Sequence, residues 1–121
     1  MLEQADILGQ AITALRKGAQ DERAIIAPDS EWILKNADVV KYITLAPETD
    51  PGFEAIRAMT AAGIAVSMGH TDADYATAAA AVAAGVRSTT HLFNAMSPLS
   101  HRSPGVVGAA LTTGVYAELI A

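Results

Sequence analysis

Two histidines follow directly after predicted strands, and their spacing would bring them to one edge of a sheet. His70 comes after an apolar run that Gly69 ends, and His91 comes 21 residues later, after the next such run. A neutral imidazole offers one nitrogen lone pair, and two imidazoles on neighbouring strand ends can bind a divalent metal. A strand-end histidine can equally be a hydrogen-bonded structural residue. The spacing alone leaves both alternatives open.

Two charged residues near the same strand ends are further candidates for chemistry. Arg102 precedes the Pro104-Gly105 turn signal, in a loop whose guanidinium and backbone N–H groups would suit a phosphate or a carboxylate ligand. The alternative, which the composition favours, is that Arg102 pairs with a carboxylate of this acidic chain. Glu48 follows another strand end, where it either touches a metal or substrate or leads into the helix that starts near Asp50.

The segments around these residues alternate between strand-like and helix-like patterns. β-branched and aromatic runs bounded by Gly or Pro predict short strands over residues 39–45, 64–68, 86–90 and 115–120. Helices are expected over residues 31–37 and 52–62, and a third begins at Thr71 or Asp72 and ends near residue 84. Such alternation with short connections is typical of an α/β fold with a parallel sheet, in which ligands gather at the carboxyl ends of the strands.

The composition excludes several classes of function. The 121 residues include no cysteine, which excludes disulfide scaffolds, cysteine-ligated zinc and thiol catalysis. The net charge is −5 without a basic run, so we expect neither nucleic acid nor an anionic membrane as a partner. The longest stretch without charge, residues 103–117, is shorter than the roughly eighteen residues of a membrane span. The N-terminus lacks a signal-peptide pattern, which predicts a cytoplasmic protein.

Small apolar side chains dominate the chain. It is 51% hydrophobic and 17% charged, with 26 alanines, and its mean hydropathy is +0.28. Alanine contributes little apolar area, although a domain of this size must bury about two thirds of its unfolded surface. We therefore expect the chain to be part of something larger or to form a homo-oligomer.

Four segments carry a resemblance to a known family. They read ITLAPE at residues 43–48, GIAVSMGHT at 63–71, THLFNAM at 90–96 and HRSPG at 101–105. In this order and at these gaps they resemble N-acetylglucosamine-6-phosphate deacetylase of the amidohydrolase superfamily. Residues 28–121 match that family well and residues 1–20 match it poorly. The resemblance implies one partial domain over residues 1–121, with about four parallel strands of a (β/α)8 TIM barrel and their helices.

The resemblance also implies an activity and a set of site residues. Enzymes of this family use a divalent metal, often zinc, to hydrolyse N-acetylglucosamine 6-phosphate to glucosamine 6-phosphate and acetate. Their two metal-ligating histidines fall on His70 and His91. Their phosphate-binding elements fall on Asn94 and Ala95, mainly through backbone N–H groups, and on Arg102. The implied partner is a small amino-sugar phosphate.

Two departures from the family's pattern limit this prediction. The family's third metal ligand, a glutamate, falls on Leu8, which cannot bind a metal. The family's catalytic aspartate lies beyond Ala121, so no catalytic residue is assigned. We expect the chain to be the middle third of such an enzyme and to be inactive alone. The alternative is a non-catalytic remnant of the fold that binds a sugar phosphate or associates with itself.

Overall fold

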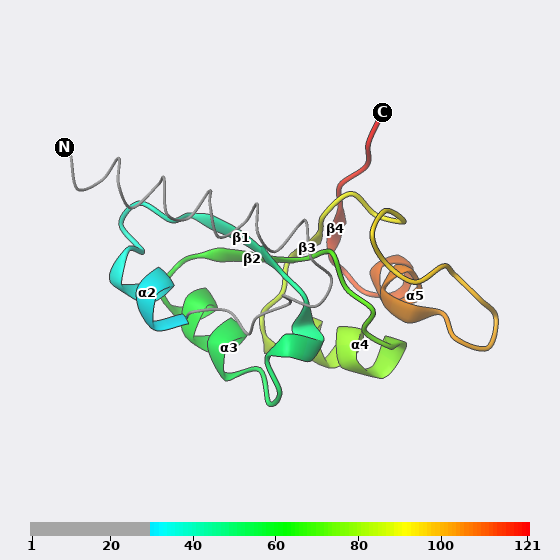
Figure 1. Cartoon of the computed structure of the whole chain (residues 1–121), viewed down its shortest axis with the longest axis horizontal. Coiled ribbons are helices and arrows are strands. Elements are labelled where there is room, and N and C mark those ends of the chain that lie inside the picture. The colour runs from blue at the N-terminus through cyan, green and yellow to red at the C-terminus, as the bar shows by residue number, and fades with distance from the viewer. Residues whose placement is uncertain (1–29) are drawn as a thin grey trace.

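The computed structural model describes residues 30–121, in which helices and short strands alternate along the chain (Figure 1). Four strands form one sheet: β1 (Tyr42–Leu45), β2 (Ala65–Met68), β3 (Ser88–Thr89) and β4 (Tyr116–Ala117). The helices are α2 (Ser30–Lys35), the short 3-10 helix η2 (Pro47–Thr49), α3 (Glu54–Ala61), α4 (Tyr75–Ala84) and α5 (Gly105–Thr112). None of these helices has the length and apolar character needed to cross a bilayer. Leu8 lies outside the described residues.

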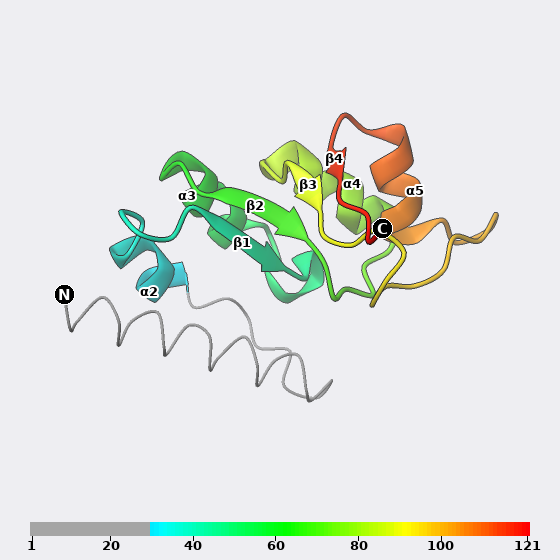
Figure 2. The same ribbon diagram turned by 90° about the horizontal axis from the view of Figure 1, so that it is seen from above.

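The sheet is parallel throughout, with its strands in the order β1-β2-β3-β4 (Figure 2). The register pairs Leu45 with Met68 and Met68 with Thr89, so β1, β2 and β3 end at the same edge. Parallel neighbours need a crossover connection, and α3, α4 and α5 provide one between successive strands. The predicted α/β fold with a parallel sheet is confirmed.

The two faces of the sheet differ in chemistry, because alternate side chains of a strand point to opposite sides. Val66 and Met68 of β2 are fully buried and form the core with Ile56 and Met59 of α3. Figure 1 shows α3 and α4 along this face. Polar side chains occupy the opposite face: Tyr42, Thr44, Ser67, Ser88 and Thr90.

The strands are shorter than the sequence predicts. The expected strand over residues 39–45 begins only at Tyr42, because the N–H groups of Val39 and Val40 donate to the Asn36 carbonyl at 2.9 and 2.8 Å. Those donors close a turn after α2 and cannot join the sheet. The last two strands each keep two paired residues of the five or six expected.

The predicted start of α4 is wrong. Asp74, and not Thr71 or Asp72, is the N-cap, since its Oδ1 accepts a hydrogen bond from the Thr77 N–H at 2.7 Å. The three residues before Asp74 are thereby left outside the helix. They form the loop that follows His70.

Helix α5 is an element that the sequence pattern does not predict. Gly105 and Gly108 lower its helix propensity. A Cβ at Gly108 would lie 2.4 Å from Pro104 Cβ, so glycine makes room for the proline that begins α5. The Tyr75 ring of α4 lies 3.5 Å from the same position, which is ordinary contact between the two helices. The Tyr75 hydroxyl is 3.0 Å from the Thr112 hydroxyl and links the same two helices. Tertiary packing therefore outweighs the weak local preference.

Candidate functional site

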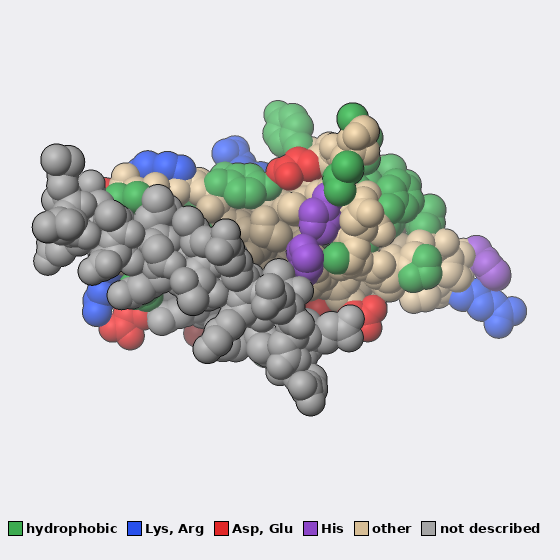
Figure 3. Space-filling model, turned by 45° about the horizontal axis from the view of Figure 1, so that its top comes forward, with side chains coloured by type: hydrophobic (Ala, Val, Ile, Leu, Met, Phe, Trp, Pro, Cys, Tyr) green, Lys and Arg blue, Asp and Glu red, His purple; other side chains and the backbone are tan. Residues whose placement is uncertain are grey.

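The structure brings the two predicted metal-ligating histidines together. His70 follows β2 and His91 follows β3, and neighbouring parallel strands place both residues at one edge. Their Nε2 atoms are 3.0 Å apart, and their rings meet edge to face at 68° with centroids 4.8 Å apart. Figure 3 shows two adjoining histidine side chains on the face that it displays. The carboxyl edge of the sheet therefore carries two imidazole rings in direct contact with each other.

The tautomer of His91 is set by its own loop. The Nδ1 atom of His91 is 3.1 Å from the carbonyl oxygen of Asn94. A carbonyl only accepts hydrogen bonds, so Nδ1 carries the proton and Nε2 presents its lone pair toward His70. A backbone carbonyl on the second ring nitrogen is the usual support of a metal-binding histidine.

The geometry of the pair fits a divalent metal. Two nitrogens that bind one tetrahedral zinc at about 2.0–2.1 Å lie about 3.3 Å from each other, close to the observed spacing. Within residues 30–121, no group of three or more His, Asp or Glu side chains is arranged to hold a metal ion. The pair of imidazole nitrogens is therefore the candidate for metal binding within the described part of the chain.

Both histidines have a backbone conformation that is unusual for their residue type. The φ angle is +48° at His70 and +33° at His91, in the left-handed region that favours glycine. Such residues persist where their surroundings fix them, and they occur often at functional sites. The hydroxyl of Thr90 lies 2.8 Å from that of Thr44 in β1 and 2.7 Å from that of Ser67 in β2, which ties the residue before His91 to both of these strands.

The loop after His91 carries two of the predicted phosphate-binding residues. Phe93 and Ala95 also have positive φ angles, +78° and +53°, so left-handed residues recur at every second position from His91. Alternation of this kind can turn successive N–H groups toward an anion. The N–H of Asn94 donates to the His91 carbonyl at 2.9 Å, so the structure uses one predicted phosphate donor inside the loop.

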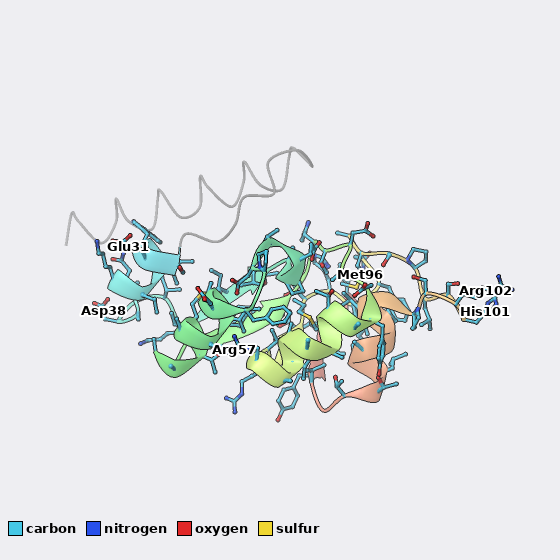
Figure 4. The ribbon with its side chains drawn as sticks, turned by 90° about the horizontal axis from the view of Figure 1, so that it is seen from below. Glu31, Asp38, Arg57, Met96, His101 and Arg102 are labelled. Atoms are coloured by element: carbon cyan, nitrogen blue, oxygen red, sulfur yellow. The ribbon has the colours of Figure 1, made fainter. Side chains whose placement is uncertain are left out.

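Arg102 is not brought to the histidine pair. It is exposed near a turn in which the backbones of Ser100 and Ser103 are hydrogen-bonded to each other. Figure 4 shows Arg102 and His101 together at the outer end of their loop, away from Met96. Within the described residues the one ion pair joins Lys35 and Glu31, so a carboxylate partner for Arg102 is not found there.

Glu48 lies at the same edge of the sheet, but its carboxylate is directed at the loop after β2. Its Oε2 accepts from the Thr71 hydroxyl at 2.5 Å, and its Oε1 accepts from the Asp72 N–H at 2.8 Å. Contact of Glu48 with a metal or substrate stays a prediction.

Sequence reasoning missed the hydroxyl cluster of Thr44, Ser67 and Thr90. The available signal was polar residues at alternate positions of the expected strands, which place them together on one face. Thr90 of this cluster immediately precedes His91 in the sequence.

Comparison with known proteins connects these features to a family. The sequence model described as "Amidohydrolase family" matches residues 1–120. The N-acetylglucosamine-6-phosphate deacetylase of Bacillus subtilis is 46% identical over 118 residues, which are 93% of this chain and 30% of that protein. The deacetylase of Lysinibacillus sphaericus is 40% identical over 119 residues, with 94% of this chain and 31% of that protein covered. The chain thus spans less than a third of the length of these relatives.

Solved structures give the same relationship. A mutant N-acetyl-D-glucosamine-6-phosphate deacetylase of Mycobacterium smegmatis, in complex with N-acetyl-D-glucosamine-6-phosphate, matches with TM-score 0.76 and 37% identity over 88% of this chain and 29% of its own. The deacetylase of Pasteurella multocida matches with TM-score 0.70 and 43% identity over 78% of this chain and 25% of its own. The four parallel strands are therefore part of an amidohydrolase TIM barrel, as predicted. Since the family match extends over nearly the whole sequence, the chain belongs to the amidohydrolase family.

Proposed function

We propose that this chain is the part of an N-acetylglucosamine-6-phosphate deacetylase that carries two metal ligands and a phosphate-binding loop. The observation that carries the proposal is the pair of Nε2 atoms 3.0 Å apart at the carboxyl ends of β2 and β3. Relatives of that name are 40–46% identical to the chain over nearly its full length. The substrate is then an amino-sugar phosphate, and the products are glucosamine 6-phosphate and acetate.

The roles of the residues follow from their chemistry. His70 and His91 hold a divalent ion, which we propose to be zinc, through their Nε2 atoms, and the Asn94 carbonyl keeps His91 in the required tautomer. When bound, the metal supplies Lewis acidity toward an amide carbonyl and toward water. Backbone N–H groups of Asn94 and Ala95 bind the phosphate, for which the Asn94 N–H must exchange its present partner. Arg102, which is exposed in the loop that follows, would offer a charged fork to the same phosphate.

A second candidate function has an observation of its own. Residues 30–121 supply no third metal-ligating side chain, and Leu8 falls where the family has its glutamate. A chain that lacks this third ligand would bind a sugar phosphate without hydrolysing it. Both candidates predict little or no acetate release by the chain alone. Calorimetric titration of the metal-free chain with a sugar phosphate separates them, because binding without metal that Arg102→Ala abolishes would favour this second function.

Zinc retention tests the proposed metal site directly. The full chain is loaded with zinc and dialysed exhaustively, and the metal per chain is measured for the wild type, His70→Ala and His91→Ala. We expect near-stoichiometric zinc in the wild type and a loss in each variant, with affinity lowered by more than about 100-fold because a removed ligand costs more than a removed supporting residue.

The matched control is His101→Ala, which removes an exposed histidine from the loop of Arg102. This variant should retain as much zinc as the wild type. Equal retention in all four proteins, or no retained zinc in the wild type, would contradict the proposed metal site.

We further propose that the protein acts in the cytoplasm and associates with copies of itself. Self-association is supported by the large exposed side chains near the end of the sequence, where Tyr116, Leu119 and Ile120 are each at least 69% exposed. Sedimentation of the chain as a single monomeric species would contradict it.

A further inference from the structure

The carboxylate of Glu48 joins two loops that come from different strands. Glu48 lies in η2, directly after β1, and Thr71 and Asp72 lie in the loop after β2. The Thr71 hydroxyl and the Asp72 N–H donate to the two oxygens of the same carboxylate, at 2.5 and 2.8 Å. Both donors belong to the two residues that directly follow His70.

Thr71 passes this connection on to the loop that holds His91. Its N–H donates to the Ala95 carbonyl at 3.0 Å, and it forms an isolated parallel bridge with Met96. The neighbouring carbonyl, that of Asn94, is the partner of His91 Nδ1. A continuous series of hydrogen bonds and adjacent peptide groups therefore runs from the Glu48 carboxylate to both imidazoles.

Glu48 itself has a rigid base. Pro47 is fully buried and fixes the backbone at the start of η2. The N–H of Thr49 donates to the Ala46 carbonyl at 3.0 Å, and the hydroxyl of the same residue donates to that oxygen at 2.6 Å. The carboxylate is exposed, whereas its partner Thr71 is only 3% exposed. The backbone contacts of η2 thus fix the position of Glu48, and its carboxylate accepts a hydrogen bond from the buried Thr71.

The left-handed backbone of His70 needs such support. A non-glycine residue in that region costs of order 1–3 kcal/mol and persists only where its surroundings fix it. On one side of His70, the N–H of Gly69 donates to the Leu45 carbonyl at 3.1 Å and continues the sheet. On the other side, the bonds of Thr71 to Glu48 and to Ala95 are the fixed points.

We propose that Glu48 is a positioning residue that sets the spacing of the His70 and His91 Nε2 atoms by holding Thr71 and Asp72. The proposal rests on the proposed function, in which those two nitrogens bind a metal. Glu48 does not itself touch the metal in this role. It acts through the backbone of the loop after β2.

Zinc affinity of the full chain measures this role, with zinc ion alone as the probe. We expect Glu48→Ala to weaken zinc binding by about 10–100-fold, as loss of a supporting partner does at other metal sites. Glu48→Gln keeps one carbonyl oxygen and should recover part of that loss. Glu31→Gln is the matched control, because that carboxylate pairs with Lys35 on α2, and it should bind zinc like the wild type.

A second measurement does not depend on the metal. In the apo chain, NMR contacts between the rings of His70 and His91 and the hydrogen-exchange protection of the Thr71 N–H report the loop itself. In Glu48→Ala we expect both to decline several-fold while the amides of β2 keep their protection. Protection lost throughout the sheet would show general unfolding, and the same two readouts in Glu48→Gln would then decide the role of Glu48.

The outcomes separate this inference from the proposed function. If the wild type binds no zinc, the proposed metal site fails, and the ring contacts and Thr71 protection still decide the role of Glu48. If the wild type binds zinc and Glu48→Ala binds it equally well with unchanged ring contacts, the positioning role is overturned while the metal site stands.

Discussion

The two loop regions at the carboxyl edge of the sheet are built differently. The histidine loops, residues 70–73 and 91–96, are hydrogen-bonded to one another and to the strand ends. The arginine loop, residues 97–104, is held by a turn between Ser100 and Ser103 and extends into solvent at its tip. Metal binding requires ligand atoms at fixed spacing, whereas a guanidinium attracts a phosphate over a longer range. The more extensively hydrogen-bonded region thus carries the two histidines for which the proposed function requires a fixed spacing.

The largest effect is expected where the histidine loops join the sheet. A Cβ at Gly69 would lie 2.7 Å from Thr44 Cγ2 and 2.9 Å from Thr90 Cβ. Gly69→Ala must therefore displace the strand ends that hold His70 and His91. We expect the free energy of unfolding to fall by about 1–3 kcal/mol, and zinc affinity to fall with it, measured by urea denaturation and zinc titration.

Gly114→Ala is the matched control for that substitution. Nothing lies within 4 Å of the position where its Cβ would be, and its φ is outside the left-handed region. This variant should be as stable as the wild type or slightly more stable. Equal stability of Gly69→Ala and Gly114→Ala would show that the strand ends adapt and that the histidine loops are less rigid than their contacts indicate.

A smaller effect is expected for a substitution in the arginine loop, which should change ligand affinity but not the stability of the fold. Arg102→Ala should change the free energy of unfolding by less than about 0.5 kcal/mol, because the side chain is exposed and outside the core. Binding of glucosamine 6-phosphate should weaken by about tenfold, as expected for the loss of a charged hydrogen bond. Calorimetric titration measures the affinity, and Arg102→Lys should recover only part of it, since an ammonium lacks the planar fork.

Arg57→Ala is the control, because Arg57 is an exposed arginine whose side chain donates to the Gly52 carbonyl. Its ligand affinity should equal that of the wild type. If Arg57→Ala and Arg102→Ala weaken binding equally, the effect comes from net charge, and the arginine loop has no specific part in the site.

The sequence predicted the features that depend on residues which end a helix or a strand locally. Gly63 ends a helix with a φ of +83°, and Gly69 ends β2 before His70, as the pattern indicates. Placing both histidines at one edge needed only the parallel order of the strands. These features follow from backbone geometry, which residues adjacent in the sequence determine.

The remaining features depend on residues that are distant in sequence. α5 forms although two glycines weaken it, because it packs on α4. The role of Glu48 depends on Thr71, 23 residues later, and no pattern near Glu48 signals that bond. The starts of β1 and α4 likewise reflect particular hydrogen bonds that the sequence pattern does not show. Secondary-structure propensity and sequence motifs therefore predict the helices, the strands and the residues at the sheet edge. Tertiary contacts determine which side chains meet.

The smallest effect is expected at Asp74, where the first histidine loop passes into α4. Hydrogen bonds from the backbone N–H and the side chain of Thr77 hold the pKa of the Asp74 carboxyl below its ordinary value of 3.8. A lowered pKa in the folded state means that the ionised carboxylate stabilises the fold above pH 3.8, and that this contribution is lost as the pH falls below that value toward the folded pKa. Asp74→Asn keeps an oxygen acceptor for the helix but removes the charge. Its melting temperature should lie slightly below that of the wild type at pH 7, and the difference should shrink in thermal unfolding measured at successively lower pH. A difference that stays constant down to the most acidic pH would mean that the ionised form of Asp74 gives α4 no additional stability over a neutral oxygen acceptor at the same N-cap position.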